Sequence, residues 1–193
     1  MALIQSVILA AGRGTRMKSS RPKVLQALAG RSLLDHVIRE QAGPVPDAIH
    51  VVYGHGGEQV RAAFAENDSL QWAEQAEQLG TGHALAQALP NIPDGAIVLV
   101  LYGDVPLVRQ DTLRSLCEVA KAGDLAVLTV LVDDPTGYGR ILRNADNQVC
   151  GIVEQKDANP DQLNINEVNS GLMAGSACAM RRWMSAVGND NAQ

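Results

Sequence analysis

Short apolar runs alternate with amphipathic stretches along the first two thirds of the chain. Four runs rich in Val, Ile and Leu predict β-strands, and they lie at residues 6–10, 48–53, 96–102 and 125–132. These runs are apolar at nearly every position, which is typical of strands whose sheet is covered on both faces. Helical spacing predicts helices at residues 32–42, 57–67, 82–89 and 112–122. Asp111 is the predicted N-cap of the last helix and Gly123 its predicted C-terminal stop.

This alternation predicts an α/β fold: a Rossmann-like, mostly parallel mixed sheet with helices on both faces. The pattern changes after residue 133. The segments RILR, NADNQ and VCGIVEQ predict a strand, a turn and a second strand, which together form a hairpin. Residues 166–177 predict another strand, residues 178–187 a closing helix, and residues 188–193 a polar tail. We find no linker that would separate two domains, and therefore expect one domain over residues 1–193.

Composition narrows the class of protein. The chain is 46% hydrophobic with a formal net charge of −5, and this acidic total argues against general nucleic-acid or membrane-surface binding. Cys117, Cys150 and Cys178 are far apart and lack CxxC spacing, so we expect reduced, buried thiols in a cytoplasmic protein. The N-terminal apolar stretch is too short for a membrane span and lacks a basic segment ahead of it.

The charge is distributed unevenly. Residues 7–23 carry five cations, and the chain has no Asp or Glu before Asp35. In this loop Gly12 and Gly14 would let backbone N–H groups approach a phosphate, while Arg16 and Lys23 would supply positive charge. Neither GxGxxG nor GxxxxGK[ST] is present, and a glycine turn with a solvated basic stretch is the alternative interpretation.

Other residues are less decisive when they are considered alone. Asp104 follows the most apolar strand, where it could anchor Mg2+ or merely shape the turn before Pro106. Gly80 and Thr81 precede a predicted helix, which is also ordinary capping chemistry. We interpret His55 and His83 as structural, because neither has a metal-spaced partner or a nearby nucleophile in the sequence.

The stretch LAAGRGTRM, followed by RPK, resembles the signature of the sugar-nucleotidyltransferase (sugar-1-phosphate pyrophosphorylase) family. Further motifs occur in the order typical of that family: VYGHGG, QAEQLGTGHA, LYGDVPL, DPTGYGRI, GIVEQKDA and NSGLMA. Together they cover nearly all of residues 5 to 193. Within the family the resemblance is to the branch that transfers the uridylyl group of UTP to N-acetylglucosamine 1-phosphate, a step in cell-wall precursor synthesis.

The resemblance implies a role for each matching residue. Arg16 and Lys23 would be catalytic and Asp104 would bind Mg2+. The implied nucleotide contacts are Leu9, Ala10, Ala11, Gly12, Gly14, Gln75, Gly80 and Thr81. The implied sugar contacts are Tyr102, Gly103, Gly139, Glu154 and Asn169.

The resemblance also carries expectations about the rest of the protein. Members of this branch continue further, so we expect the nucleotidyltransferase domain to be incomplete at its C-terminus. A second Mg2+ ligand, an Asn, and an acetyltransferase β-helix would lie outside these residues. The full-length relative is expected to be a trimer and this fragment a monomer.

Three alternatives stay open. The first is a sister nucleotidyltransferase with another sugar 1-phosphate or with dTTP. The second is a catalytically silent nucleotide-binding module. The third is a purely structural α/β domain, which would leave the basic loop unexplained.

Overall fold

The computed structural model describes residues 2–12, 14, 17, 19–42, 47–54 and 56–186. The chain divides into two compact units. Among the described residues, the first contains those up to Ala126 together with 173–186, and the second contains Val127–Leu172. No helix among the described residues is long and apolar enough to cross a membrane.

The sheet of the first unit is built from parallel strands. Its order is β5 (Leu70–Glu74), β4 (Ala48–Tyr53), β1 (Ile4–Leu9) and β6 (Ile97–Tyr102). The last four residues of β10 (Glu167–Ser176) pair antiparallel with β6. The predicted α/β class with a mostly parallel mixed sheet is therefore confirmed.

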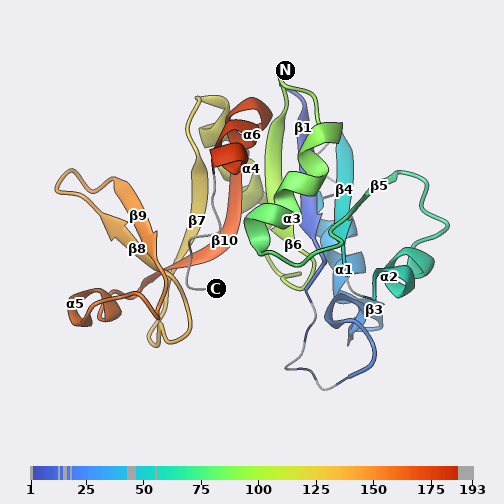
Figure 1. Cartoon of the computed structure of the whole chain (residues 1–193), viewed down its shortest axis with the longest axis horizontal. Helices are drawn as coiled ribbons and strands as arrows, with labels where there is room; N and C mark the ends of the chain where they lie inside the picture. Colours follow the sequence, from blue (N-terminus) through green and yellow to red (C-terminus); the bar gives the residue numbers. More distant parts are fainter. Residues whose placement is uncertain are drawn as a thin grey trace. The chain divides into compact units, whose positions relative to one another are not determined.

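Helices cover both faces of this sheet (Figure 1). On one face α3 (Thr81–Ala88) and α6 (Ala177–Ala186) enclose a core that includes Val7, Val98 and Val100. Side chains alternate along a strand, so Ile8 and Leu99 point to the opposite face. Three further helices contain buried residues and are assigned to that opposite face. They are α1 (Leu33–His36), the following π-helix Val37–Ala42, and α4 (Gln110–Lys121). Buried strands thus explain the continuously apolar runs.

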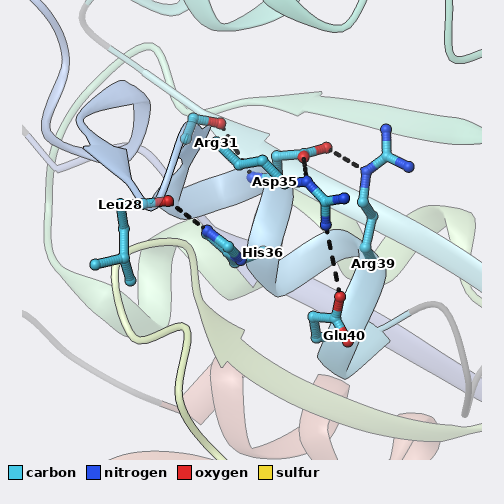
Figure 2. Close-up of polar contacts among 7 residues, drawn as sticks. Leu28, Arg31, Asp35, His36, Arg39 and Glu40 are labelled. Atoms are coloured by element: carbon cyan, nitrogen blue, oxygen red, sulfur yellow. Dashed lines mark hydrogen bonds and ion pairs between the residues drawn. The ribbon is translucent and has the colours of Figure 1, made fainter.

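A small hairpin joins the glycine-bearing loop to α1. Strands β2 (Ala27–Leu28) and β3 (Arg31–Ser32) pair through a turn in which Ala29 and Gly30 have positive φ. His36 Nε2 lies 2.7 Å from the Leu28 carbonyl oxygen, and because that oxygen can only accept, His36 donates (Figure 2). Asp35 lies between two arginines, with Arg39 Nε at 2.8 Å and Arg31 Nε at 3.9 Å (Figure 2). The contacts of His36 with Leu28 and of Asp35 with Arg31 hold the hairpin against the helix.

The second unit consists mainly of strands. Most of β7 (Ala126–Leu131) and the first half of β10 belong to it, with β8 (Arg140–Arg143), β9 (Val149–Val153) and the short α5 (Pro160–Leu163). β8 and β9 pair antiparallel, and β8 pairs with β10 at Val168. A bidentate ion pair joins two of these strands, with Arg143 Nη2 2.6 Å from Glu167 Oε1 and Nε 2.8 Å from Oε2.

Most predicted elements are confirmed within two residues of their ends, including the hairpin, the long strand after it and the closing helix. Three predictions are wrong. The helix predicted over residues 57–67 is α2 (Gly57–Ala63), because Phe64 leaves helical geometry with φ −125°. The N-cap of α4 is Arg109 and not Asp111, which lies in the first turn. Cys117 is buried as expected, whereas Cys150 and Cys178 are exposed.

The Arg143–Glu167 pair predicts how the stability of the second unit depends on pH. The hydrogen-bonded Arg143 guanidinium lowers the pKa of Glu167 to about 2. A depressed carboxyl pKa gives stability that is fully present above the unfolded value of 4.5 and is lost as pH falls toward 2. Because both side chains are partly exposed, we expect about 1 kcal/mol from the pair.

Glu167→Gln should therefore lower the free energy of unfolding by about 1 kcal/mol at pH 6, measured by urea denaturation. It should also flatten the loss of stability between pH 5 and pH 3. Glu118→Gln is the control, since Glu118 forms an exposed helix pair with Lys121. Equal pH profiles for wild type and Glu167→Gln would contradict the assignment.

Candidate nucleotide site

A cavity of about 630 Å³ opens at the carboxyl ends of β1 and β6 in the first unit. In parallel sheets this edge is where ligands bind. The cavity contains all eight predicted nucleotide contacts, together with Lys23, Tyr102 and Asp104 from the other predicted sets. Four further residues line it, and these are Met17, Val24, Gln78 and Ala84. The fold thus brings together residues that lie far apart in the sequence, while their roles stay predictions.

Two predicted residues are treated separately. Arg16 lies outside the described residues. Gly103 does not line the cavity but packs beneath it, where an added Cβ would lie 3.1 Å from Val24 Cγ1 and 3.3 Å from Leu34 Cδ1. Its N–H donates to the Leu9 carbonyl over 3.0 Å. Gly103 therefore fixes the position of the cavity floor.

Close backbone packing positions Lys23. Gly14 has a φ of +58°, and a Cβ added there would lie 2.8 Å from Lys23 Cβ. Pro22, with φ −50°, precedes a 3-10 turn that begins at Lys23 and buries Val24 and Leu25. The lysine backbone is thus fixed on both sides, as the proline in the motif suggested.

The Lys23 ammonium forms an ion pair with the Asp104 carboxylate. The side chains retain 42% and 22% of their exposure, so both charges remain accessible from the cavity. The described residues contain no cluster of three or more His, Cys, Asp or Glu that could hold a metal ion. One carboxylate beside the glycine-bearing loop nevertheless fits Mg2+, which usually takes one or two protein carboxylates and completes its shell with phosphate oxygens and water.

Gln78 is a functional candidate that sequence reasoning missed. Its Nε2 donates to the Ala11 carbonyl over 2.9 Å, and an added Cβ at Gly54 would lie 3.0 Å from Ala11 Cβ. The loops after β1, β4 and β5 therefore meet at Ala11. The only sequence signal was the position of Gln78 within QAEQLGTGHA, next to the residues that were singled out.

Gln75 and His83 are in direct contact. The Gln75 side chain is 3% exposed, and its Nε2 lies 3.0 Å from the Gly80 carbonyl oxygen and 3.1 Å from His83 Nδ1. His83 is thus tied to a cavity residue, although its sequence context suggested only a structural role. His55, the other histidine interpreted as structural, lies outside the described residues.

Three predicted sugar contacts lie in the second unit and come together there. Asn169 N–H donates to the Gly139 carbonyl over 2.8 Å. A Cβ added at Gly139 would lie 3.2 Å from Glu154 Oε1, so the glycine leaves room for that carboxylate. The Asn169 backbone and the Glu154 carboxylate thus lie next to the Gly139 backbone, while the Asn169 side-chain oxygen accepts from the Gly171 N–H over 2.9 Å.

Comparison with known proteins decides the family. Residues 6–151 match the model of the MobA-like NTP transferase domain. The chain belongs to this family of NTP transferase domains. That assignment confirms the family resemblance that the motifs indicated.

Curated relatives and a solved structure agree with this family assignment. This NTP transferase domain is 61% identical over 187 residues to the bifunctional protein GlmU of Stenotrophomonas maltophilia, covering 97% of this chain and 41% of that protein. It is 58% identical over 193 residues to GlmU of Halorhodospira halophila, covering 40% of that protein. The chain thus spans about two fifths of the length of these relatives. A solved structure of a putative glucose-1-phosphate thymidylyltransferase from Bacillus anthracis is similar to this chain, with a TM-score of 0.74 and 16% sequence identity. The match covers 92% of this chain and 73% of that one, and it shows that the two share a fold.

The glycine loop supplies a stability test. Gly14→Ala should lower the free energy of unfolding by about 1 kcal/mol or more, because the new methyl group meets Lys23 at a positive φ. Gly12→Ala is the matched control, since a Cβ there meets no protein atom within 4 Å. Thermal unfolding without ligand measures both. Equal melting temperatures for the two variants would contradict the packing described for Gly14.

Proposed function

We propose that this domain transfers the uridylyl group of UTP to N-acetylglucosamine 1-phosphate with the help of Mg2+, releasing pyrophosphate. The observation that carries the proposal is the Lys23–Asp104 pair inside a cavity lined by the glycine loop and by Gln75. This arrangement combines groups suited to a triphosphate with groups suited to a base. The resemblance to the uridylyltransferase branch and the high identity to GlmU proteins support the choice of substrates.

The chemistry would require charge neutralisation and positioning. A sugar 1-phosphate is anionic at neutral pH, so its oxygen can attack the α-phosphorus of UTP without a general base. Pyrophosphate would leave on the opposite side of that phosphorus. Lys23 and Arg16 would balance charge on the triphosphate, and backbone N–H groups at Gly12 and Gly14 would orient it.

Asp104 would hold Mg2+, which supplies charge neutralisation on the phosphates when bound. Gly139, Glu154 and Asn169 would bind the sugar, since a carboxylate accepts from hydroxyl groups and an amide both donates and accepts. Tyr102 is the sugar contact proposed from the first unit. A sister enzyme that uses another sugar phosphate or dTTP is the second candidate, because sugar and base selectivity depend on few of these residues.

The first test is pyrophosphate release with UTP and Mg2+, comparing N-acetylglucosamine 1-phosphate with glucose 1-phosphate. Release with the N-acetylated sugar and little with glucose 1-phosphate is the expected result. Equal rates with both sugars, or a preference for dTTP over UTP, would favour the sister enzyme.

Lys23→Ala should lower turnover by about two orders of magnitude or more while the fold stays intact, because the lysine would neutralise charge that develops during the reaction. Lys121→Ala is the control, since Lys121 lies at the end of α4 and pairs with Glu118. Turnover of Lys23→Ala within a few fold of wild type would remove Lys23 from the mechanism.

A further inference from the structure

The orientation of the Gln75 amide follows from its neighbours. Its nitrogen carries two hydrogens, and two partners lie within reach: the Gly80 carbonyl oxygen at 3.0 Å and His83 Nδ1 at 3.1 Å. Rotating the amide by half a turn would place Oε1 against the Gly80 oxygen, and two acceptors would then meet without a hydrogen between them. Oε1 is therefore the end of this cavity side chain that remains to accept a hydrogen bond.

This orientation also fixes the tautomer of His83. If Nδ1 accepts from Gln75, the ring proton must be on Nε2. His83 Nε2 lies 3.1 Å from Gln87 Nε2, which is also 3.1 Å from the His83 carbonyl oxygen. A neutral imidazole has one acceptor nitrogen, so the two amides compete for it.

The competition is unequal. Gln75 is 3% exposed and cannot exchange its partners for water, whereas Gln87 is only partly buried and can give up its contact with the ring nitrogen for water. Leaving a buried acceptor facing another acceptor costs more than giving up a bond that water can replace. The Nε2–H tautomer, with Gln75 as the donor to Nδ1, is the favoured state.

We propose that His83 is a positioning residue for base selection. By accepting the second hydrogen of the Gln75 nitrogen, beside the Gly80 carbonyl that accepts the first, it holds the amide so that Oε1 is presented to the base, and this acceptor selects a base that carries an N–H at the facing position. The imide N3–H of uracil or thymine satisfies Oε1, whereas N3 of cytosine is itself an acceptor. This inference rests on the proposed function only for the binding of a nucleoside triphosphate in this cavity.

The test is calorimetric titration of the whole chain with UTP, dTTP and CTP in the presence of Mg2+. Wild type should bind both UTP and dTTP, because each offers the same N3–H group to Oε1. It should bind UTP more tightly than CTP. His83→Leu replaces the acceptor nitrogen with an apolar side chain. The ratio of UTP affinity to CTP affinity should therefore fall about tenfold or more. Gln87→Leu is the matched control on the other ring nitrogen, and it should keep the preference.

A spectroscopic measurement makes the test independent of how well the variants fold. The ¹⁵N shifts of the wild-type imidazole should report an unprotonated Nδ1 and a protonated Nε2. A protonated Nδ1 would overturn the proposal, as would a UTP preference that survives in a folded His83→Leu variant. If wild type binds none of the triphosphates or does not prefer UTP to CTP, the base assignment of the proposed function fails. Loss of the UTP preference in His83→Leu, with the preference kept in wild type and in Gln87→Leu, supports the inference.

Discussion

The parallel pairing of β1 with β4 and β6 is the constraint on which the cavity depends. Parallel neighbours end at the same edge of a sheet, so the segments after Leu9, Tyr53 and Tyr102 start side by side. The pairing continues past the strands, since Ala10 N–H donates to the Val52 carbonyl over 2.8 Å. The glycine-bearing loop is therefore anchored by sheet hydrogen bonds on one side and by the turn at Lys23 on the other.

The apolar pattern predicted this sheet well because its central strands are buried on both faces. It missed β5, an edge strand of five residues, LQWAE, in which the exposed Gln71 and Glu74 interrupt the apolar residues. The N-cap of α4 was misplaced as well, since Arg109 takes that position without a side-chain cap hydrogen bond. Leu113 and Leu116 are buried whichever of the two residues caps the helix, so the apolar pattern does not decide where α4 begins, and Asp111 in the first turn still interacts favourably with the free N–H groups there.

The candidate site was predictable where it consists of local motifs. The glycine loop, Asp104 at a strand end and the Gly80–Thr81 entry to α3 each allow an ordinary structural interpretation when taken alone, and it is their order along the chain that indicated the family. Contacts between motifs were not predictable from spacing. Gln78 meets Ala11 across 67 residues, and the Gly139–Asn169 hydrogen bond joins the residue before β8 to β10. Such pairs depend on strand order and register, which residue types alone do not specify.

The Lys23–Asp104 pair is better explained by ligand chemistry than by stability. An accessible ion pair contributes about 0–1 kcal/mol, because water and salt screen the charges and two side chains lose freedom. A protein gains little stability by keeping opposite charges in an open cavity, yet the backbone around Lys23 is fixed by Gly14 and Pro22. Under the proposed function each charge has an alternative partner, phosphate for the lysine and Mg2+ for the carboxylate. A weak pair suits that role, since each member can exchange its partner for a ligand at little cost.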